Sequence, residues 1–309
     1  MSKISVVVTA FNEEENIEEC LASIRDLADE IIVVDNNSQD KTGEIARKFT
    51  KKVFTQKNDP KKIDVNKNFG FSKATGGWIL SIDADERVTE ELASEIKKIV
   101  KRPSESASGY WIPRKNIIFK KWIKSDMWWP DYQLKLFRRG KGSFDKNQVH
   151  KPLKVEGETE KLEMPLIHNN YTSITQFITK LNNYTDIEAE NLSAEYEFNW
   201  LDAIRFPIND FVKTFFLQKG YQDGLHGLVL SMLQAFYMEV VFAKLWEKRG
   251  FKEVEGNNFV EEVGQEFKNS RSKIMYWIKT ALINKSKNSI KKIILKASRK
   301  IDASKIRPF

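Results

Sequence analysis

The sequence has little of what secreted and membrane-spanning proteins use. Its 309 residues include a single cysteine, Cys20, which excludes an intramolecular disulfide framework and a cysteine-based zinc cluster. No apolar run approaches the roughly 20 residues that a membrane-spanning helix requires. Residues 1–12 carry no signal-peptide pattern, because a strand is predicted to begin at Lys3. We therefore expect a cytoplasmic protein that is not integral to a membrane.

Basic residues are outnumbered by acidic ones before residue 268. Residues 268–309 hold thirteen Lys/Arg and one acidic residue, Asp302, within a chain of net charge +8. Ile, Leu and Trp recur in this tail at helical spacing, with Lys at other positions, which predicts an amphipathic basic helix. Such a helix can bind an anionic membrane surface. A solvated or oligomer-forming helix is one alternative; nucleic acid binding is the other, but no nucleic-acid-binding module accompanies the tail, so no such partner is expected.

The first hundred residues alternate strand-like runs with helical patterns. The predicted strands are 4–10, 30–35, 51–56 and 78–82, and helices lie between them, one of them around 64–74. This alternation predicts an α/β fold with a Rossmann-like, mostly parallel sheet and helices on both faces. Ligands of such sheets bind beyond the carboxyl ends of the strands, where Thr9, Asp35 and Asp83 lie.

The pattern changes after residue 88. A helix is predicted from Thr89 to about Lys101, then strands over 109–119 and 132–139, and irregular chain to His168. From Ser173 onward the pattern is helical. We therefore predict a sheet-containing domain over 1–172, a helical region over 173–267 and the basic tail over 268–309.

The stretch "WILSIDADERV" (78–88) ends an apolar strand with Asp83 and Asp85. Residues i and i+2 of a strand share a face, so both carboxylates point into one small volume and favour a cation there. Mg²⁺ or Mn²⁺, completed by phosphate oxygens and water, is suitable, and it would neutralise the charge of a departing diphosphate. The alternative is that both residues only form a turn and cap the next helix.

Three motifs together resemble the nucleotide-sugar-binding half of family 2 glycosyltransferases, which have the GT-A fold: "VVVTAFNEEENI", "IIVVDNNSQDKT" and "NKNFG…ATGGWILSIDADE". The later stretches "WWPDYQLKLFRRGKGSF" and "KGYQDGLHG" are similar to the subgroup related to bacterial lipopolysaccharide-core β-glucosyltransferases. The resemblance implies an inverting, metal-assisted enzyme that transfers a hexose from a nucleotide-diphosphate sugar to a cell-envelope glycan or a lipid-linked saccharide.

The resemblance also implies roles for residues after the first strand. Thr9, Ala10 and Phe11 would line the pocket of the nucleotide base, while Asn12 and Glu14 would shape the adjacent loop.

Four further residues acquire roles by the same resemblance. Asp35 would accept the imide N–H of uracil, which favours a UDP donor, although it could instead simply end a strand. Lys67 stands where the family usually has Arg, so it keeps the charge but not the planar fork; the alternative is a solvated helix residue. Asp83 would face the ribose and the metal, and Asp85 would coordinate the metal. Apart from the resemblance, His168, like His150, is a candidate third metal ligand or a cleft residue, because Mn²⁺ tolerates neutral imidazole; the alternative is a structural histidine.

An inverting mechanism needs a general base, usually a carboxylate. The subgroup commonly has Glu after the His of "QVHKPL", but here Lys151 follows His150, and a charged lysine cannot accept a proton. Asp131 and Asp145 are the nearby carboxylates. Asp131 is preferred because its aromatic neighbours in "WWPDY" could stack on a sugar face; alternatively those aromatics belong to the core or face a membrane.

Two other functions fit the same motifs. A nucleotidyltransferase on this fold would transfer the nucleotide itself. A non-catalytic envelope-assembly protein would keep only nucleotide binding, an alternative raised by Lys67 and Lys151. Sugar transfer with free UDP as co-product would distinguish the enzyme from both.

Overall fold

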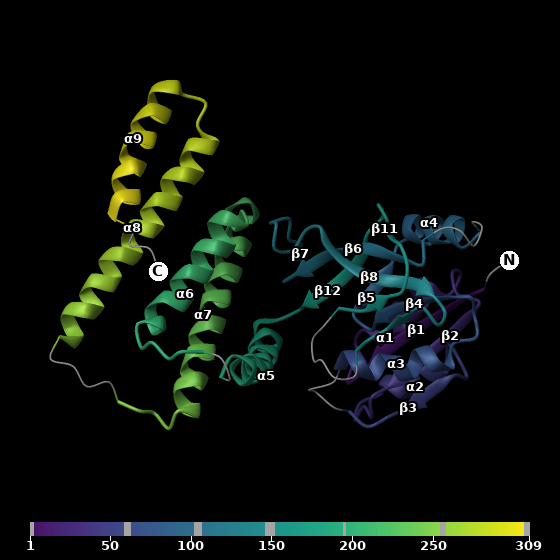
Figure 1. Ribbon diagram of the computed structural model, residues 1–309. Coiled ribbons are helices and arrows are strands. Elements are labelled where there is room, and N and C mark those ends of the chain that lie inside the picture. The colour runs from purple at the N-terminus through teal and green to yellow at the C-terminus, as the bar shows by residue number, and fades with distance from the viewer. Residues whose placement is uncertain are drawn as a thin grey trace. The chain divides into compact units, whose positions relative to one another are not determined.

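The computed structural model describes residues 3–58, 63–101, 107–145, 152–193, 196–253 and 258–305. The chain forms two compact units (Figure 1). We call Met1–Trp122 with Trp128–Thr172 the sheet unit, and Ile123–Met127 with Ser173–Phe309 the helical unit. The two units meet along the chain at Thr172 and Ser173, and a five-residue segment of the first part groups with the second.

The sheet unit begins as an alternating α/β fold, as predicted. Its first four strands are β1 (Ile4–Ala10), β2 (Glu30–Asp35), β3 (Val53–Thr55) and β4 (Trp78–Asp83), joined by α1 (Ile17–Ile24), α2 (Thr42–Arg47) and α3 (Ile63–Lys73). These strands lie in the order β3-β2-β1-β4, and every neighbouring pair is parallel. The predicted Rossmann-like half is therefore confirmed.

The second half of the sheet is mixed. After β4 the order continues β8 (Asp131–Arg138), β6 (Gly109–Ile118), β12 (Leu166–Tyr171) and β5 (Glu86–Val88), with β8 antiparallel to both its neighbours. The short strands are β7 (Lys121–Trp122), β9 (Gly142–Ser143), β10 (Lys154–Val155) and β11 (Thr159–Lys161). The prediction of irregular chain up to His168 is wrong for β10, β11 and β12, because these short or half-polar segments become strands only by pairing with β9, with β6, and with β6 and β5, respectively.

Helices cover both faces of the sheet, because successive residues of β1 point to opposite sides. Val6 and Val8 pack with α1 and with α4 (Glu90–Val100), whereas Val7 packs with α3. Thr89 caps α4 by accepting a hydrogen bond from the Leu92 N–H at 3.1 Å. The predicted start of this helix is confirmed, so neither aspartate of "SIDADE" is its cap.

The helical unit contains α5 (Ile174–Ser193), α6 (Asp202–Phe211), the π-helix η1 (Val212–Leu217), the 3₁₀ helix η2 (Gly220–Asp223), α7 (Leu225–Lys248), α8 (Phe259–Lys285) and α9 (Ser289–Lys305). Within this unit α6 and α5 pack against α7, and α8 packs against α9. The predicted limit at residue 268 falls inside α8, because a change in charge does not mark the end of a helix.

The motif "KGYQDGLHG" has a packing role in the helical unit. The buried carboxylate of Asp223 accepts backbone N–H groups of Lys124 at 3.0 Å and Ser125 at 2.9 Å. A Cβ at Gly227 would lie 1.8 Å from the carbonyl oxygen of Gly220. Glycine is thus required where α7 passes η2, and Asp223 attaches the Ile123–Met127 segment to the helical unit.

One helix of the described residues, α7, is long and apolar enough to cross a membrane by length and composition. A third of its most apolar window is buried within the protein, and core helices of soluble proteins meet the same criterion. The prediction that no apolar segment reaches this length is wrong, since Glu239 alone does not end the apolar stretch around it.

Candidate functional site

The carboxyl ends of β1, β2 and β4 meet at one edge of the sheet. Thr9 on β1 lies opposite Asp83 on β4, and Ala10 lies opposite Asp35 on β2. The hydroxyl oxygen of Thr9 is buried and has no hydrogen-bond partner among the residues that the structure describes. The strand pairing therefore places Thr9, Ala10, Asp35 and Asp83, four of the residues predicted to bind the donor, side by side.

The loops after β1 and β2 are joined by hydrogen bonds. Oδ1 of Asn12 accepts the backbone N–H of Gln39 at 2.8 Å, and Oε2 of Glu14 accepts that of Lys41 at 3.1 Å. Asn12 has a positive φ of 54°, a conformation that Asn tolerates better than most residues. Phe11 is 40% exposed beside them. Asn12 and Glu14 thus fix the shape of the loop that follows Ala10.

Asp35 is buried at the end of β2. Its Oδ1 accepts the backbone N–H of Ser38 at 2.9 Å. A Cβ at Gly43 would lie 2.7 Å from the other carboxylate oxygen. The position of this carboxylate therefore depends on a glycine in the first turn of α2, which sequence reasoning did not identify.

Asp83 is held by two lysines. Lys67 on α3 lies 2.7 Å from Oδ1 of Asp83, and Lys135 on β8 lies 2.8 Å from Oδ2. Burial alone would raise the pKa of Asp83, but the charges of Lys135 and then Lys67 hold it well below its usual value. Lys67 is itself buried, so the alternative of a solvated helix lysine is wrong.

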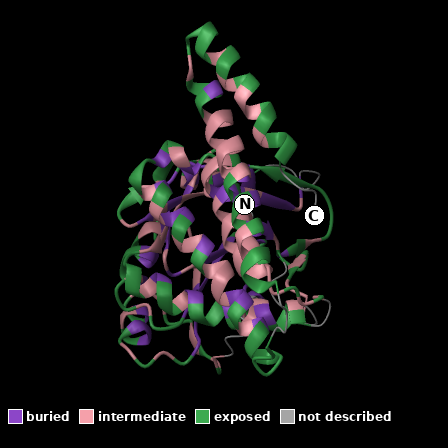
Figure 2. Ribbon diagram, turned by 90° about the vertical axis from the view of Figure 1, so that its left-hand side faces the viewer, coloured by how far each residue is buried: buried purple, intermediate pink, exposed green. Residues whose placement is uncertain are grey.

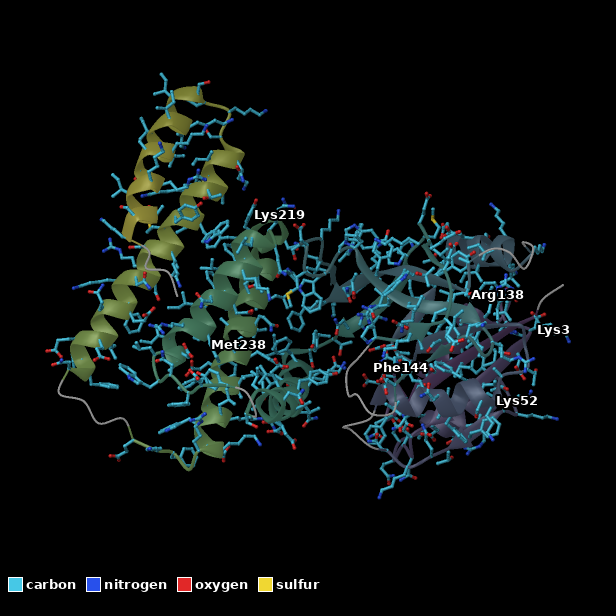
Figure 3. All side chains as sticks on the ribbon, viewed as in Figure 1. Lys3, Lys52, Arg138, Phe144, Lys219 and Met238 are labelled. Atoms are coloured by element: carbon cyan, nitrogen blue, oxygen red, sulfur yellow. The ribbon has the colours of Figure 1, made fainter. Side chains whose placement is uncertain are left out.

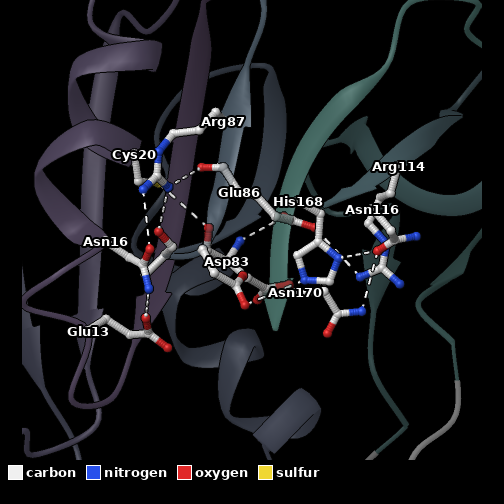
Figure 4. Close-up of polar contacts among 12 residues, drawn as sticks. Glu13, Asn16, Cys20, Asp83, Glu86, Arg87, Arg114, Asn116, His168 and Asn170 are labelled. Atoms are coloured by element: carbon white, nitrogen blue, oxygen red, sulfur yellow. Dashed lines mark hydrogen bonds and ion pairs between the residues drawn. The ribbon is translucent and has the colours of Figure 1, made fainter. Parts of the chain in front are cut away.

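Glu86, Lys135 and Arg114 extend this cluster, and sequence reasoning missed all three. Glu86 is fully buried, and its Oε2 accepts from Nζ of Lys135 at 2.7 Å. The same oxygen accepts from the backbone N–H of Asp83 at 2.9 Å (Figure 4). Arg114 approaches Oε1 of Glu86 at 3.7 Å. The signal was available: Lys135 interrupts the apolar strand "LKLF" and so had to be buried or paired.

Asp131 lies at the start of β8 and is saturated with hydrogen bonds. Its Oδ2 accepts from Nε of Arg114 at 2.8 Å and from Nδ2 of Asn116 at 3.2 Å, and its Oδ1 accepts from Gln133 at 2.8 Å. Burial alone would raise the pKa of Asp131, but the charge of Arg114 and these hydrogen bonds outweigh burial and lower that pKa. Asp131 is therefore ionised but, in this arrangement, a weak proton acceptor.

His168 on β12 faces Asp85 in an orientation set by the buried Asn116. Nδ2 of Asn116 donates to the carbonyl of Trp128 at 2.9 Å and to Asp131, which turns its Oδ1 toward Nδ1 of His168 at 2.7 Å. An amide oxygen only accepts, so the network assigns the hydrogen to Nδ1. In the neutral ring, Nε2 then points its lone pair at Oδ2 of Asp85, 3.5 Å away. Two acceptors facing each other favour a cation between them.

The residues fit a divalent cation at Asp85 and His168, since Mn²⁺ prefers carboxylate oxygen and tolerates imidazole nitrogen. A metal-bound histidine usually donates its other ring N–H, as His168 does to Asn116. Within the described ranges no three Asp, Glu, His or Cys side chains form a metal-ligand set. The predicted trio with Asp83 is therefore not assembled, because both oxygens of Asp83 face lysine ammonium groups.

Asp145 lies apart from these ion pairs. It lines a cavity of about 560 Å³ together with Phe71, Phe144 and Lys154, and Nζ of Lys154 lies 3.3 Å from its Oδ2. Phe144 is labelled in Figure 3, and the centroid of its ring lies 5.8 Å from Nζ of Lys67. His150 and Lys151, which the sequence singled out beside Asp145, lie outside the described residues.

The predicted aromatic platform beside Asp131 is partly engaged within the protein. Trp129 packs edge-to-face on Trp122, with ring centroids 5.3 Å apart. Lys161 lies over the ring of Tyr132 at 4.4 Å. These rings therefore already have partners, although all remain partly exposed.

Comparison with known proteins identifies one family. The family model described as "Glycosyl transferase family 2" matches residues 5–155. An uncharacterized glycosyltransferase of Rickettsia typhi is 30% identical over 259 residues, which cover 80% of this chain and 88% of that protein. The lipopolysaccharide core biosynthesis glycosyltransferase LpsC of Rhizobium meliloti is 24% identical, covering 81% of this chain and 94% of that protein.

Among solved structures, S. aureus TarS 1–349 in complex with UDP is similar with a TM-score of 0.42 and 16% identity, covering 82% of this chain and 93% of that chain. This partial structural overlap adds no functional argument to the sequence relationship.

Proposed function

The chain belongs to glycosyltransferase family 2, and we propose that it transfers a hexose, with inversion, from a UDP-linked donor to a hydroxyl of a cell-envelope glycan or lipid-linked saccharide. The observation that carries this proposal is the convergence of Asp35, at the end of β2, with Asp83 and Asp85, at and just after the end of β4, on the two strands that flank β1. The acceptor class is supported by the likeness to LpsC, whose name places it in lipopolysaccharide core biosynthesis.

In this proposal the donor's uracil binds beside Asp35, with Thr9, Ala10 and Phe11 lining the base pocket. The Asp35 carboxylate accepts the imide N–H of uracil, and the hydroxyl of Thr9, which has no hydrogen-bond partner within the described part of the chain, is a further polar group at this edge. Asp83 faces the ribose. Lys67 neutralises phosphate charge in place of the arginine common in the family, once the donor competes with Asp83 for its ammonium group.

Asp85 and His168 would hold Mg²⁺ or Mn²⁺ together with diphosphate oxygens and water. When bound, the ion supplies Lewis-acid stabilisation of the departing diphosphate. Asn116 keeps Nε2 of His168 directed at the site, and Lys135 adds a fixed positive charge beside Asp83. Asp83 would become a ligand only on the release of Lys67 or Lys135.

Asp131 is our candidate general base. It would take the proton from the acceptor hydroxyl as that oxygen bonds to the anomeric carbon and the bond to the diphosphate breaks. Its low pKa keeps it in the proton-accepting form, and catalytic contacts often tighten only when substrates are bound. Asp145, beside the cavity, is the second candidate.

We further propose that the enzyme works at the inner face of the cell membrane, held there by its basic C-terminal helices. Lipid-linked acceptors reside at such a surface, and residues 268–309 are strongly net positive whereas residues 1–267 are net negative. The protein would then be peripheral and cytoplasmic.

The test is an assay of the full chain with a panel of UDP-hexoses, Mn²⁺ and detergent-dispersed envelope lipids. We expect hexose incorporation with stoichiometric free UDP, and Asp131→Asn should abolish transfer while UDP still binds. Asp145→Asn is the matched comparison. Release of pyrophosphate with nucleotide incorporation would identify a nucleotidyltransferase instead, and UDP binding without turnover of any donor would identify a non-catalytic protein.

A further inference from the structure

α9 exposes a stripe of isoleucines. Ile290, Ile293, Ile294 and Ile301 are 57–71% exposed, and α9 has no buried residue (Figure 2). Spacings of three, four and seven residues place these side chains on one face of an α-helix. Single apolar residues are scattered over the surface of most proteins, whereas four large apolar side chains on one exposed face form a continuous patch, which indicates an interaction site.

The opposite face of α9 is already occupied by α8. Lys279 of α8 donates to Oγ of Ser298 at 2.6 Å and forms an ion pair with Asp302. Arg299 lies over the ring of Tyr276 at 5.3 Å. The isoleucine stripe is therefore the face that α8 leaves open, and the one acidic residue of α9 is neutralised within the hairpin.

Lysines border the stripe on both sides. At about 100° per residue, Lys291 and Lys305 lie on one side of the isoleucines, and Lys296 and Lys300 lie on the other. Long lysine side chains can keep their ammonium groups in a polar layer while their stems lie along apolar material. An apolar stripe between two rows of positive charge is complementary to the layered structure of an anionic lipid surface.

We propose that α9 binds an anionic lipid surface, with the isoleucine stripe inserted at the boundary of headgroups and acyl chains and the bordering lysines contacting anionic headgroups. A second copy of the chain fits less well, because a two-fold pairing of this face would bring its lysine rows together. Nucleic acid would use the lysines but leave the isoleucines exposed. The biological purpose rests on the proposed function, since α9 would hold the enzyme near a lipid-linked acceptor.

Co-sedimentation of the full chain with vesicles of equal parts phosphatidylglycerol and phosphatidylcholine measures this binding. Ile290→Ser combined with Ile294→Ser leaves the net charge unchanged and should weaken binding about tenfold or more, because apolar side chains no longer enter the interface. The control, Ile174→Ser with Val260→Ser, removes exposed apolar side chains of the same unit outside α9 and should bind like wild type.

The charge contribution is tested by Lys296→Gln with Lys300→Gln, which should weaken binding and reduce its dependence on salt. Wild-type binding by the Ile290→Ser/Ile294→Ser variant would overturn the proposal, as would equal binding to phosphatidylcholine alone. Loss of a dimer in that variant with vesicle binding intact would assign the stripe to a second copy instead. Asp85→Ala should keep vesicle binding while losing UDP binding, so the membrane and enzyme proposals can fail separately.

Discussion

Ion pairs are arranged differently in the two units. In the sheet unit Asp83, Glu86 and Asp131 share one connected cluster with Lys67, Lys135 and Arg114. In the helical unit three ion pairs with no residue in common each tie one helix to another: Arg205 to Glu266, Lys244 to Asp186 and Lys279 to Asp302. Separate ion pairs can fix the contacts between helices. A connected cluster of buried charges carries a desolvation penalty instead, and such clusters are characteristic of functional sites.

Breaking the buried cluster should have the largest effect. Glu86→Gln removes the negative charge that faces Lys135 in a fully buried place and should destabilise the sheet unit by about 3 kcal/mol. Urea denaturation measures the loss. Glu156→Gln, at an exposed pair with Lys141, is the control and should change nothing measurable. If Glu86→Gln were as stable as Glu156→Gln, the charges of the cluster would have to be in contact with water rather than buried.

The helical unit should break at its closest backbone approach. Gly227→Ala places a methyl group against the carbonyl of Gly220 and should cost about 2–3 kcal/mol. Hydrogen exchange should increase in α7 and η2 and stay unchanged in β1 and β4. Gly264→Ala on α8 has open space around it and should be neutral or stabilising by up to about 1 kcal/mol. Similar effects at both glycines would contradict the packing assigned to this motif.

The connection between cluster and catalysis should appear in a pH profile. Arg114 lowers the pKa of Asp131, so Arg114→Met should raise that pKa. A base acts when deprotonated, and the acid limb of kcat/KM should therefore move to higher pH, with turnover reduced about tenfold through lost positioning. Lys115→Met, the next residue of β6, is the control. An unmoved acid limb would exclude Asp131 as the base.

The smallest effect on stability is expected from Glu30, the first residue of β2, which lies at the opposite end of that strand from Asp35. Burial alone raises the pKa of Glu30, but hydrogen bonds from Lys52, Ser5 and Thr75 outweigh it and lower the pKa to about 2. This stabilisation is complete above the ordinary glutamate pKa of about 4.3 and disappears as pH falls toward 2. Glu30→Gln should therefore cost about 1 kcal/mol at neutral pH and nothing near pH 2. A loss of stability that persists at pH 2 would contradict this assignment.

The sequence predicted the parallel half of the fold well and the remainder less well. β1 and β2 match their predicted bounds because long apolar runs leave no other place for those residues. β12 was missed because "LIHNNY" is half polar and becomes a strand only through pairing with β6 and β5.

The candidate site divides in the same way. Asp35, Asp83 and Asp85 were predictable because strand ends of a parallel sheet converge. Arg114 and Asn116 were not, because a polar residue within a strand is ordinarily assigned to solvent. Lys135 carried a signal, since it interrupts the apolar stretch "LKLF", but only the antiparallel pairing of β8 with β6 and β4 places these three residues at the cluster.

The most direct test of the central claim is thermal unfolding with UDP, in the presence and absence of Mn²⁺, for wild type and Asp85→Ala. A ligand that binds only the folded state must raise Tm. We predict that UDP raises the Tm of wild type only when Mn²⁺ is present, and that Asp85→Ala removes the increase. No change in wild type under any condition, or an equal increase in Asp85→Ala, would contradict a metal-assisted UDP-sugar site at the end of β4.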